Sequence, residues 1–177
     1  MTPRPVILVI MGVSGSGKTT LGEALAGRLG WPFKEGDDLH PPANVARMAA
    51  GVALTDADRA PWLAAVAHWI EDWRDAGTSG LITCSALKRA YRETLSQGRP
   101  EVLFVYLHGE PGLLAARVAR RKGHFMPPAL LASQLADLEP PAPDEPAIAV
   151  DIDQPIAAQV ETVIQALAAD TPRLART

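Results

Sequence analysis

Short apolar runs alternate along the chain with longer segments in which apolar residues recur every three or four positions. The runs predict strands at about 5–11, 32–35, 80–84, 102–107 and 147–151. The second run is the weakest, because it contains few apolar residues. Strands that alternate with helices form parallel sheets covered on both faces, so the pattern predicts a single α/β domain over residues 1–170.

The helical segments carry apolar stripes. The first segment follows the first strand, from Gly17 to about Leu29. Two further stripes contain Trp62, Leu63, Val66, Trp69, Ile70 and Trp73, and Ile156, Val160, Val163, Ile164 and Leu167. We interpret both stripes, tryptophans included, as core packing, since helical periodicity usually marks a buried face. Residues 171–177 show no such pattern and predict a disordered tail.

One turn between a strand and a helix has the sequence of a phosphate-binding loop (P-loop). It matches G-x-x-x-x-G-K-[ST] and consists of Gly12, Val13, Ser14, Gly15, Ser16, Gly17, Lys18 and Thr19. Its glycines let backbone N–H groups converge on phosphates at the start of a helix. We expect Lys18 to reach the β- and γ-phosphates and the Thr19 hydroxyl to ligate Mg²⁺. The loop therefore predicts binding of a nucleoside triphosphate.

Composition narrows the classes of partner and the compartment. The chain has 177 residues, of which 47% are hydrophobic and 21% charged, as in an ordinary soluble globular protein. With a net charge of −3, the chain has no overall positive charge that would attract nucleic acid or acidic membranes. No apolar run is long enough for a membrane span. The single cysteine, Cys84, fits a reducing compartment, and no signal peptide is evident, so we expect a cytoplasmic location.

An acidic turn follows the second strand, at the edge of the sheet where the P-loop lies. Asp37 is the candidate base for an acceptor hydroxyl, and Asp38 is the less favoured neighbour. Glu35 lies two positions before Asp37, which on an extended segment places both on one face, and it is a candidate for holding the hydration shell of Mg²⁺. The alternative for this turn is a solvated loop in which an aspartate caps the next helix.

A basic segment follows the fourth strand and its helix. Arg117 and Arg121 are four positions apart, so we expect them on one helical face, directed at the triphosphate. The segment at about 117–130 predicts a lid, with a hinge after Gly123. The alternative is a favourable placement of cations at the carboxyl end of a helix. His124 is a candidate either for binding an anionic substrate or for capping the turn.

Five ordered motifs together resemble the gluconokinase family over about residues 6–168. They are the P-loop and residues 36–41, 54–63, 84–92 and 121–126. The resemblance implies transfer of the γ-phosphate of ATP to the 6-hydroxyl of D-gluconate. It also implies a P-loop NTPase fold of the nucleoside-monophosphate-kinase-like type, which is a three-layer sandwich with strand order 2-3-1-4-5 and a lid, and a homodimer.

The resemblance also assigns substrate-binding residues. Arg59 and Lys88 are the candidate cations for the gluconate carboxylate, and a guanidinium is the better partner because it bonds both oxygens. Without the resemblance, the preferred interpretation of Arg59 is a surface ion pair with Asp56 or Asp58. His40 is either a donor to a substrate hydroxyl or a structural residue of the turn.

On the nucleotide side, the resemblance implies roles for the lid and for the segment after the fifth strand. Arg121 is expected to act in catalysis and substrate binding, and Arg117 and Pro155 to lie against the nucleotide. The third strand ends without the acidic residue that many P-loop proteins use for magnesium. Ser85 and Glu35, acting through water, are the expected substitutes.

Two rival functions remain compatible with the P-loop. A kinase of the same fold that acts on another small acid or alcohol, such as shikimate, would share the loop, the base and the lid. A nucleotide-dependent switch would need guanine-recognition and switch motifs, Asn-Lys-x-Asp and Asp-x-x-Gly, and the chain contains neither.

Overall fold

The computed structural model describes residues 4–121 and 127–174. Five parallel strands form one sheet in the order β2-β3-β1-β4-β5, as the resemblance implied. The strands are β1 (Ile7–Met11), β2 (Phe33–Lys34), β3 (Gly80–Thr83), β4 (Val102–His108) and β5 (Ala147–Asp151). Every residue of the central strand β1 is buried, because helices cover both faces of the sheet.

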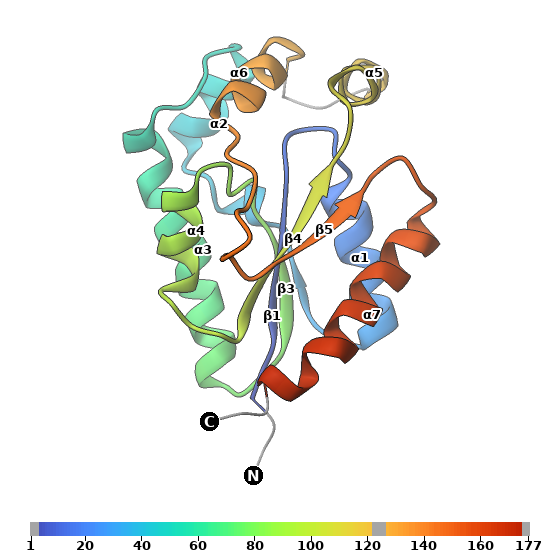
Figure 1. The fold of residues 1–177 in the computed structure, drawn as a ribbon. Helices are drawn as coiled ribbons and strands as arrows, with labels where there is room; N and C mark the ends of the chain where they lie inside the picture. Colours follow the sequence, from blue (N-terminus) through green and yellow to red (C-terminus); the bar gives the residue numbers. More distant parts are fainter. Residues whose placement is uncertain (1–3, 122–126, 175–177) are drawn as a thin grey trace.

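Helices form the outer layers and a cap over one end of the sheet. Figure 1 shows α3 (Asp56–Asp75) and α4 (Arg89–Ser96) on one side of the sheet, and α1 (Lys18–Leu29) and α7 (Ile156–Leu174) on the other. The carboxyl end of the sheet is covered by α2 (Pro42–Ala49), α5 (Pro111–Arg120) and α6 (Ala129–Asp137). Both apolar stripes pack into the core as predicted, with Trp62 and Val163 almost fully buried.

The structure differs from the sequence-based expectations at several ends of elements. The third strand stops at Thr83, and the fourth continues through His108. Helix α7 continues to Leu174, so residues 171–174 of the expected tail are helical, and 175–177 lie outside the described residues. The apolar stripe that the sequence predicts ends at Leu167, before the helix does.

Two predicted geometries are wrong. Arg121 has an extended backbone (φ −72°, ψ 117°) just after α5 ends, so it does not share a helical face with Arg117. The acidic turn is not extended after Glu35: residues Gly36–Leu39 form a 3₁₀ helix, η1. In both cases a local change of backbone conformation breaks the periodicity on which the expectation depended.

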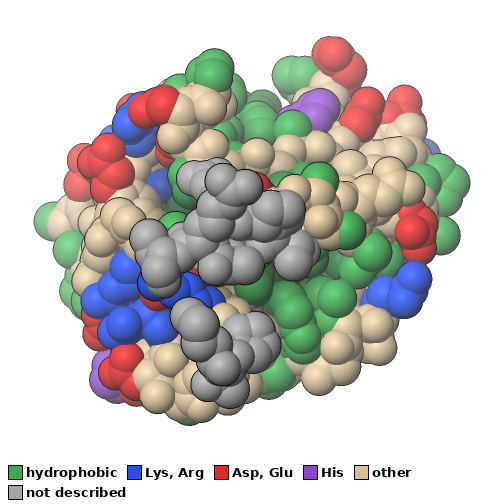
Figure 2. Space-filling model, turned by 60° about the horizontal axis from the view of Figure 1, so that its bottom comes forward, with side chains coloured by type: hydrophobic (Ala, Val, Ile, Leu, Met, Phe, Trp, Pro, Cys, Tyr) green, Lys and Arg blue, Asp and Glu red, His purple; other side chains and the backbone are tan. Residues whose placement is uncertain are grey.

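The surface seen in Figure 2 mixes all classes of side chain. Lys and Arg side chains gather on the left with acidic side chains beside them, and hydrophobic side chains occupy much of the right half. Within the described ranges, no helix combines the length and the apolar character that crossing a membrane requires.

Candidate active site

The P-loop joins β1 to α1 and takes its shape from glycine. Gly15 and Gly17 have φ of 81° and 90°, a left-handed conformation that other residues adopt at a cost. A Cβ atom at Gly15 would lie 2.7 Å from Cγ2 of Val118, so the loop also packs closely against α5. Gly17 precedes the first turn of α1, and the free N–H groups of that turn point out of the helix end. This is the geometry of a phosphate site.

Lys18 lies at the centre of the pocket that the P-loop borders. Its Nζ donates to the carbonyl oxygens of Gly12 (3.0 Å) and Val13 (3.1 Å). Burial lowers the pKa of the Lys18 ammonium, while the negative charges of Asp37 and Glu35 oppose this shift. The lysine therefore lies between the P-loop carbonyls and the acidic turn, close enough to Asp37 and Glu35 for their charges to affect it.

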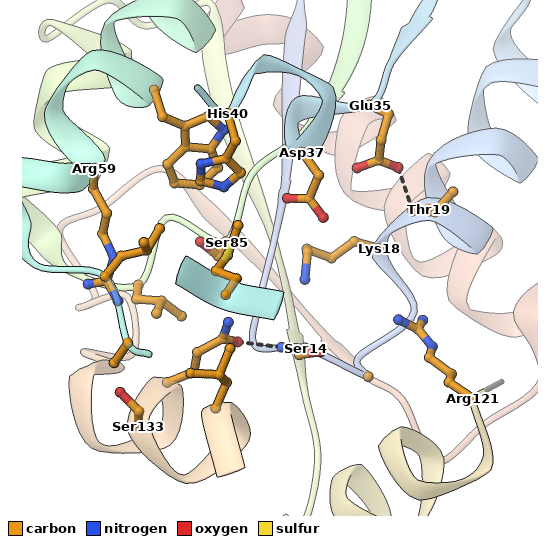
Figure 3. A pocket seen from close by; sticks show the side chains of 18 of the residues that line it. Ser14, Lys18, Thr19, Glu35, Asp37, His40, Arg59, Ser85, Arg121 and Ser133 are labelled. Atoms are coloured by element: carbon orange, nitrogen blue, oxygen red, sulfur yellow. Dashed lines mark hydrogen bonds between the residues drawn. The ribbon is translucent and has the colours of Figure 1, made fainter. Parts of the chain in front are cut away.

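Glu35 connects the acidic turn to the start of α1. The Thr19 hydroxyl donates to its carboxylate at 2.5 Å, and the Thr83 hydroxyl at the end of β3 donates to the other carboxylate oxygen. Figure 3 shows Glu35 and Thr19 side by side at the edge of the pocket. No group of three or more His, Cys, Asp or Glu side chains with metal-binding geometry occurs in the part of the chain that the structure describes.

The acidic turn is held tightly against β3 at Gly36. A Cβ atom there would lie 1.7 Å from the carbonyl oxygen of Thr83, so only glycine fits. The Gly36 N–H donates to the Thr83 hydroxyl (2.9 Å), and the Trp62 indole donates to the Gly36 carbonyl (2.9 Å). With the turn fixed in this way, Asp37 lines the pocket, whereas Asp38 is not in the lining and its side chain pairs with Lys34 at 3.9 Å.

His40 follows η1 and also lines the pocket. Its ring stacks on the indole of Trp62, with 4.1 Å between centroids and 14° between planes. Burial lowers the pKa of His40 to about 4, and the positive charge of Arg59 contributes to the shift. The imidazole is therefore neutral at physiological pH.

Arg59 is a buried cation within the first turn of α3. Only 7% of the residue is exposed, and Nη1 donates to the Tyr91 hydroxyl (2.8 Å) and to the Asp137 carboxylate (2.9 Å). The interpretation as a surface ion pair with Asp56 or Asp58 is therefore wrong. Arg59 lines the pocket on the side opposite the P-loop, as Figure 3 shows.

Lys88, the other candidate for the substrate carboxylate, lies apart from this pocket. Its Nζ pairs with Asp56 at 3.0 Å, and it is not among the described residues that line the pocket. The same Asp56 accepts a hydrogen bond from the Tyr91 hydroxyl. Lys88 is thus connected to Arg59 through Asp56 and Tyr91 rather than placed next to it.

The residues expected at the nucleotide are divided between two places. Arg121 lines the pocket near Lys18 and lowers the pKa of that lysine, an effect smaller than that of burial. Arg117 donates from Nη2 to the Ile152 carbonyl (2.9 Å), which ties α5 to the segment after β5. The Pro155 carbonyl accepts from the first turn of α7, and Pro155 lies outside the pocket lining. His124 falls outside the described residues.

Helix α6 supplies pocket residues that the sequence did not reveal. The Ser14 N–H of the P-loop donates to Oε1 of Gln134 at 2.6 Å, and Ser133 lies beside it in the lining. Gln134 and Asp137 are three positions apart, so one face of α6 contacts both the P-loop and Arg59. The i, i+3 spacing is visible in the sequence. It points to the site only once the fold shows that α6 lies over it.

Two smaller expectations concern the end of β3. Ser85 lines the pocket, as its proposed role with magnesium requires. Cys84 is buried, and burial raises the pKa of its thiol to about 12, so a reactive thiolate is excluded at neutral pH. Cys84 thus acts as a small core residue.

Comparisons with known proteins agree with this geometry. The family model for shikimate kinase matches residues 14–139. A gluconokinase of Gluconobacter oxydans (strain 621H) is 56% identical over 147 residues, which cover 83% of each chain. The thermosensitive gluconokinase of Escherichia coli (strain K12) is 44% identical over 162 residues, which cover 91% of this chain and 87% of the relative.

A solved gluconokinase structure has the same fold as this chain. The crystal structure of a gluconokinase from Sinorhizobium meliloti 1021 superposes with a TM-score of 0.85 at 45% identity, and the match covers 97% of each chain. Fold, P-loop and sequence similarity over most of the chain are thus consistent with one another. The chain belongs to the gluconokinase family of shikimate-kinase-like, ATP-dependent P-loop kinases.

Proposed function

We propose that the protein transfers the γ-phosphate of ATP to the 6-hydroxyl of D-gluconate, forming 6-phosphogluconate and ADP. One observation carries the proposal: a single pocket is bordered by the P-loop on one side and the buried cation Arg59 on the other, with Asp37 between them. A phosphate donor and an anionic acceptor can therefore meet at Asp37. The names of the similar proteins support gluconate as the acceptor.

The acceptor hydroxyl is activated by Asp37 in this proposal. Its carboxylate accepts the proton of the 6-hydroxyl while the hydroxyl oxygen forms a bond to the γ-phosphorus, and the bond from that phosphorus to the bridging oxygen of ADP breaks. Arg59 binds the carboxylate at the other end of gluconate and so sets the position of the 6-hydroxyl. His40 donates to a hydroxyl between these ends.

On the donor side, two cations stabilise the negative charge of the phosphoryl group. Lys18 and Arg121 face the transferring phosphoryl group, where negative charge is spread over its oxygens in the transition state. Burial makes the Lys18 ammonium more effective, because few water molecules compete for its charge. We further propose that Arg117 and Pro155 contact the nucleotide, and that His124 and Lys88 contribute to the substrate side when the lid at 117–130 closes.

The Thr19 hydroxyl and the Glu35 carboxylate fit a hydrated magnesium ion. Both are hard oxygen ligands, they lie in contact at 2.5 Å, and Mg²⁺ usually keeps several waters and needs few protein ligands. Ser85 lines the same pocket and adds another oxygen. When bound with ATP, the ion would neutralise charge on the β- and γ-phosphates.

A substrate panel tests the function. Purified protein with ATP and Mg²⁺ should release ADP with D-gluconate, and slowly or not at all with other sugar acids and with shikimate. Shikimate belongs in the panel because the matching family model is that of shikimate kinase. Turnover of shikimate without turnover of gluconate would overturn the proposal. The D37N variant, assayed in parallel, separates acceptor-dependent ADP release from contaminating ATPase activity.

The cellular setting is a further part of the proposal, in which the resemblance supports the homodimer and the composition of the chain supports the rest. We propose a homodimer that acts in the cytoplasm on a free small molecule, with no nucleic-acid or membrane partner. Light scattering coupled to size-exclusion chromatography measures the oligomeric state directly. A mass of about one chain, where one chain is 18.8 kDa, would contradict the dimer.

A further inference from the structure

His40 is held in a fixed orientation at the acceptor side of the pocket. It lies three residues after Asp37, just past the end of η1, and both residues line the pocket. Trp62 stacks flat on the imidazole, and the Trp62 indole is itself bonded to the Gly36 carbonyl. The ring plane is thus set by two contacts before any ligand binds.

The side-chain amide of Asn44, in α2, contacts the imidazole of His40. Its side chain is buried, and Nδ2 donates to the Asp58 carbonyl oxygen at 2.8 Å. A carbonyl oxygen only accepts hydrogen bonds, so this atom must be the amide nitrogen. The same Nδ2 lies 3.3 Å from Nδ1 of His40, and its second hydrogen is available for this contact. Nδ1 therefore has to be the acceptor.

We propose that Asn44 is a positioning residue that fixes His40 as the neutral tautomer protonated at Nε2, so that Nε2–H donates a hydrogen bond to a hydroxyl of the acceptor substrate. The identity of that acceptor rests on the proposed function. Asn44 itself is not among the residues that line the pocket, so its effect passes through the imidazole.

The electrostatics of the site agree with this assignment. An imidazolium ion has no lone pair, so protonation of His40 would lose the bond from Asn44 as well as bring a second cation close to Arg59. The low pKa of His40, about 4, has burial as its main cause and Arg59 as the second. A neutral ring has a functional benefit, because an imidazolium beside Asp37 would weaken that carboxylate as a base.

The tautomer can be observed directly in the ligand-free protein. The chain has four histidines, and the ¹⁵N signals of His40 are those that vanish in H40Q. We expect a protonated Nε2 and an unprotonated Nδ1 from about pH 8 down to about pH 5, a range above the lowered pKa. In N44L the two nitrogens should shift toward a mixture of tautomers. A proton on Nδ1 in the unmodified protein would overturn the proposal.

Kinetics test whether the tautomer serves the substrate. N44L should raise the KM for gluconate about three- to tenfold, the loss expected for one hydrogen bond, with the KM for ATP unchanged. R47Q is the matched control: Arg47 also comes from α2 and pairs with Asp58 at 3.6 Å, but it makes no bond to His40. Its KM for gluconate should equal that of the unmodified protein.

A double-mutant cycle separates positioning from a structural role. In H40Q the side-chain amide keeps a neutral donor and has no tautomer to fix, so adding N44L should change the KM for gluconate by less than about twofold. An equal cost of N44L in both backgrounds, or an altered tautomer with an unchanged KM, would overturn the proposal. Absence of gluconate turnover in the unmodified protein would instead refute the proposed function, while the tautomer measurement would stand.

Discussion

The donor and acceptor halves of the pocket are built in different ways. The donor half is one loop of eight consecutive residues, Gly12–Thr19, in which left-handed glycines and backbone groups form the site. The acceptor half is assembled from side chains of η1, α3 and α6, which are separated by up to about a hundred residues. A site made of backbone is specified locally, whereas a site made of side chains depends on the whole fold.

The halves also differ in the contacts that hold their functional groups in place. In the acceptor half, Arg59 and His40 are each held by other side chains: Arg59 by Asp137 and Tyr91, and His40 by Asn44 and Trp62. Removing one partner leaves a polar group buried without its bond, which costs more than the bond itself. We therefore expect variants that remove contacts in the acceptor half to raise the KM for gluconate. Variants of the donor half should weaken the binding of ATP.

The largest effect is expected at Asp37. D37N should lower kcat by about 10²–10⁴-fold, the contribution typical of a general base, while ATP affinity changes little. Single-turnover rates and calorimetric ATP titration measure the two quantities separately. D38N is the matched control: its carboxylate is exposed and pairs with Lys34, so activity should remain. Loss of activity in D38N with activity retained in D37N would exchange their roles.

The next largest effect is expected in the donor half. K18A should reduce kcat by about 10²–10³-fold, as for removal of one group that stabilises transition-state charge. It should also weaken ATP binding, because Nζ holds the carbonyls of Gly12 and Val13 in the loop. K34A provides the control, since Lys34 lies near the acidic turn but not in the pocket lining. A rise in the KM for gluconate alone would contradict the division into halves.

The same contrast explains what the sequence could and could not predict. The sequence predicts the whole P-loop, because its spacing and the strand before it are local features. The strand order and the placement of Asp37 and Arg59 on a shared pocket agree with a resemblance to a family, and periodicity alone would not have produced them. Sheet order depends on which apolar strand edges pair, and that information is not local.

Residues that act through tertiary contacts are the ones that the sequence does not reveal. The apolar stripe predicts Trp62 in the core, where it lies, but its indole also bonds the Gly36 carbonyl and stacks on His40. Gln134 lies in an otherwise ordinary apolar helix, and its distance of 120 positions from Ser14 along the chain hides their contact. Tertiary packing decides both roles, so no pattern within one segment reveals them.

Arg59 offers a sharper test of the acceptor half. R59K keeps the charge but loses the planar fork that bonds two carboxylate oxygens, so the KM for gluconate should rise about 10- to 100-fold with the KM for ATP unchanged. R89K is the control, because Arg89 makes a two-point contact with Asp144 on the exposed surface. An unchanged KM for gluconate in R59K would remove Arg59 from the substrate site.

The smallest effect is expected where the halves meet, at α6. Q134A removes the acceptor of the Ser14 N–H, at a cost of about 1 kcal/mol, which is a few-fold change in KM. The KM for ATP should rise because the P-loop loses a contact, and the KM for gluconate should rise because α6 also carries the partner of Arg59. D137N, which leaves Gln134 in place, should raise only the KM for gluconate. If Q134A raises the KM for ATP alone, a change at the P-loop does not reach Arg59 through α6, and the two halves are independent.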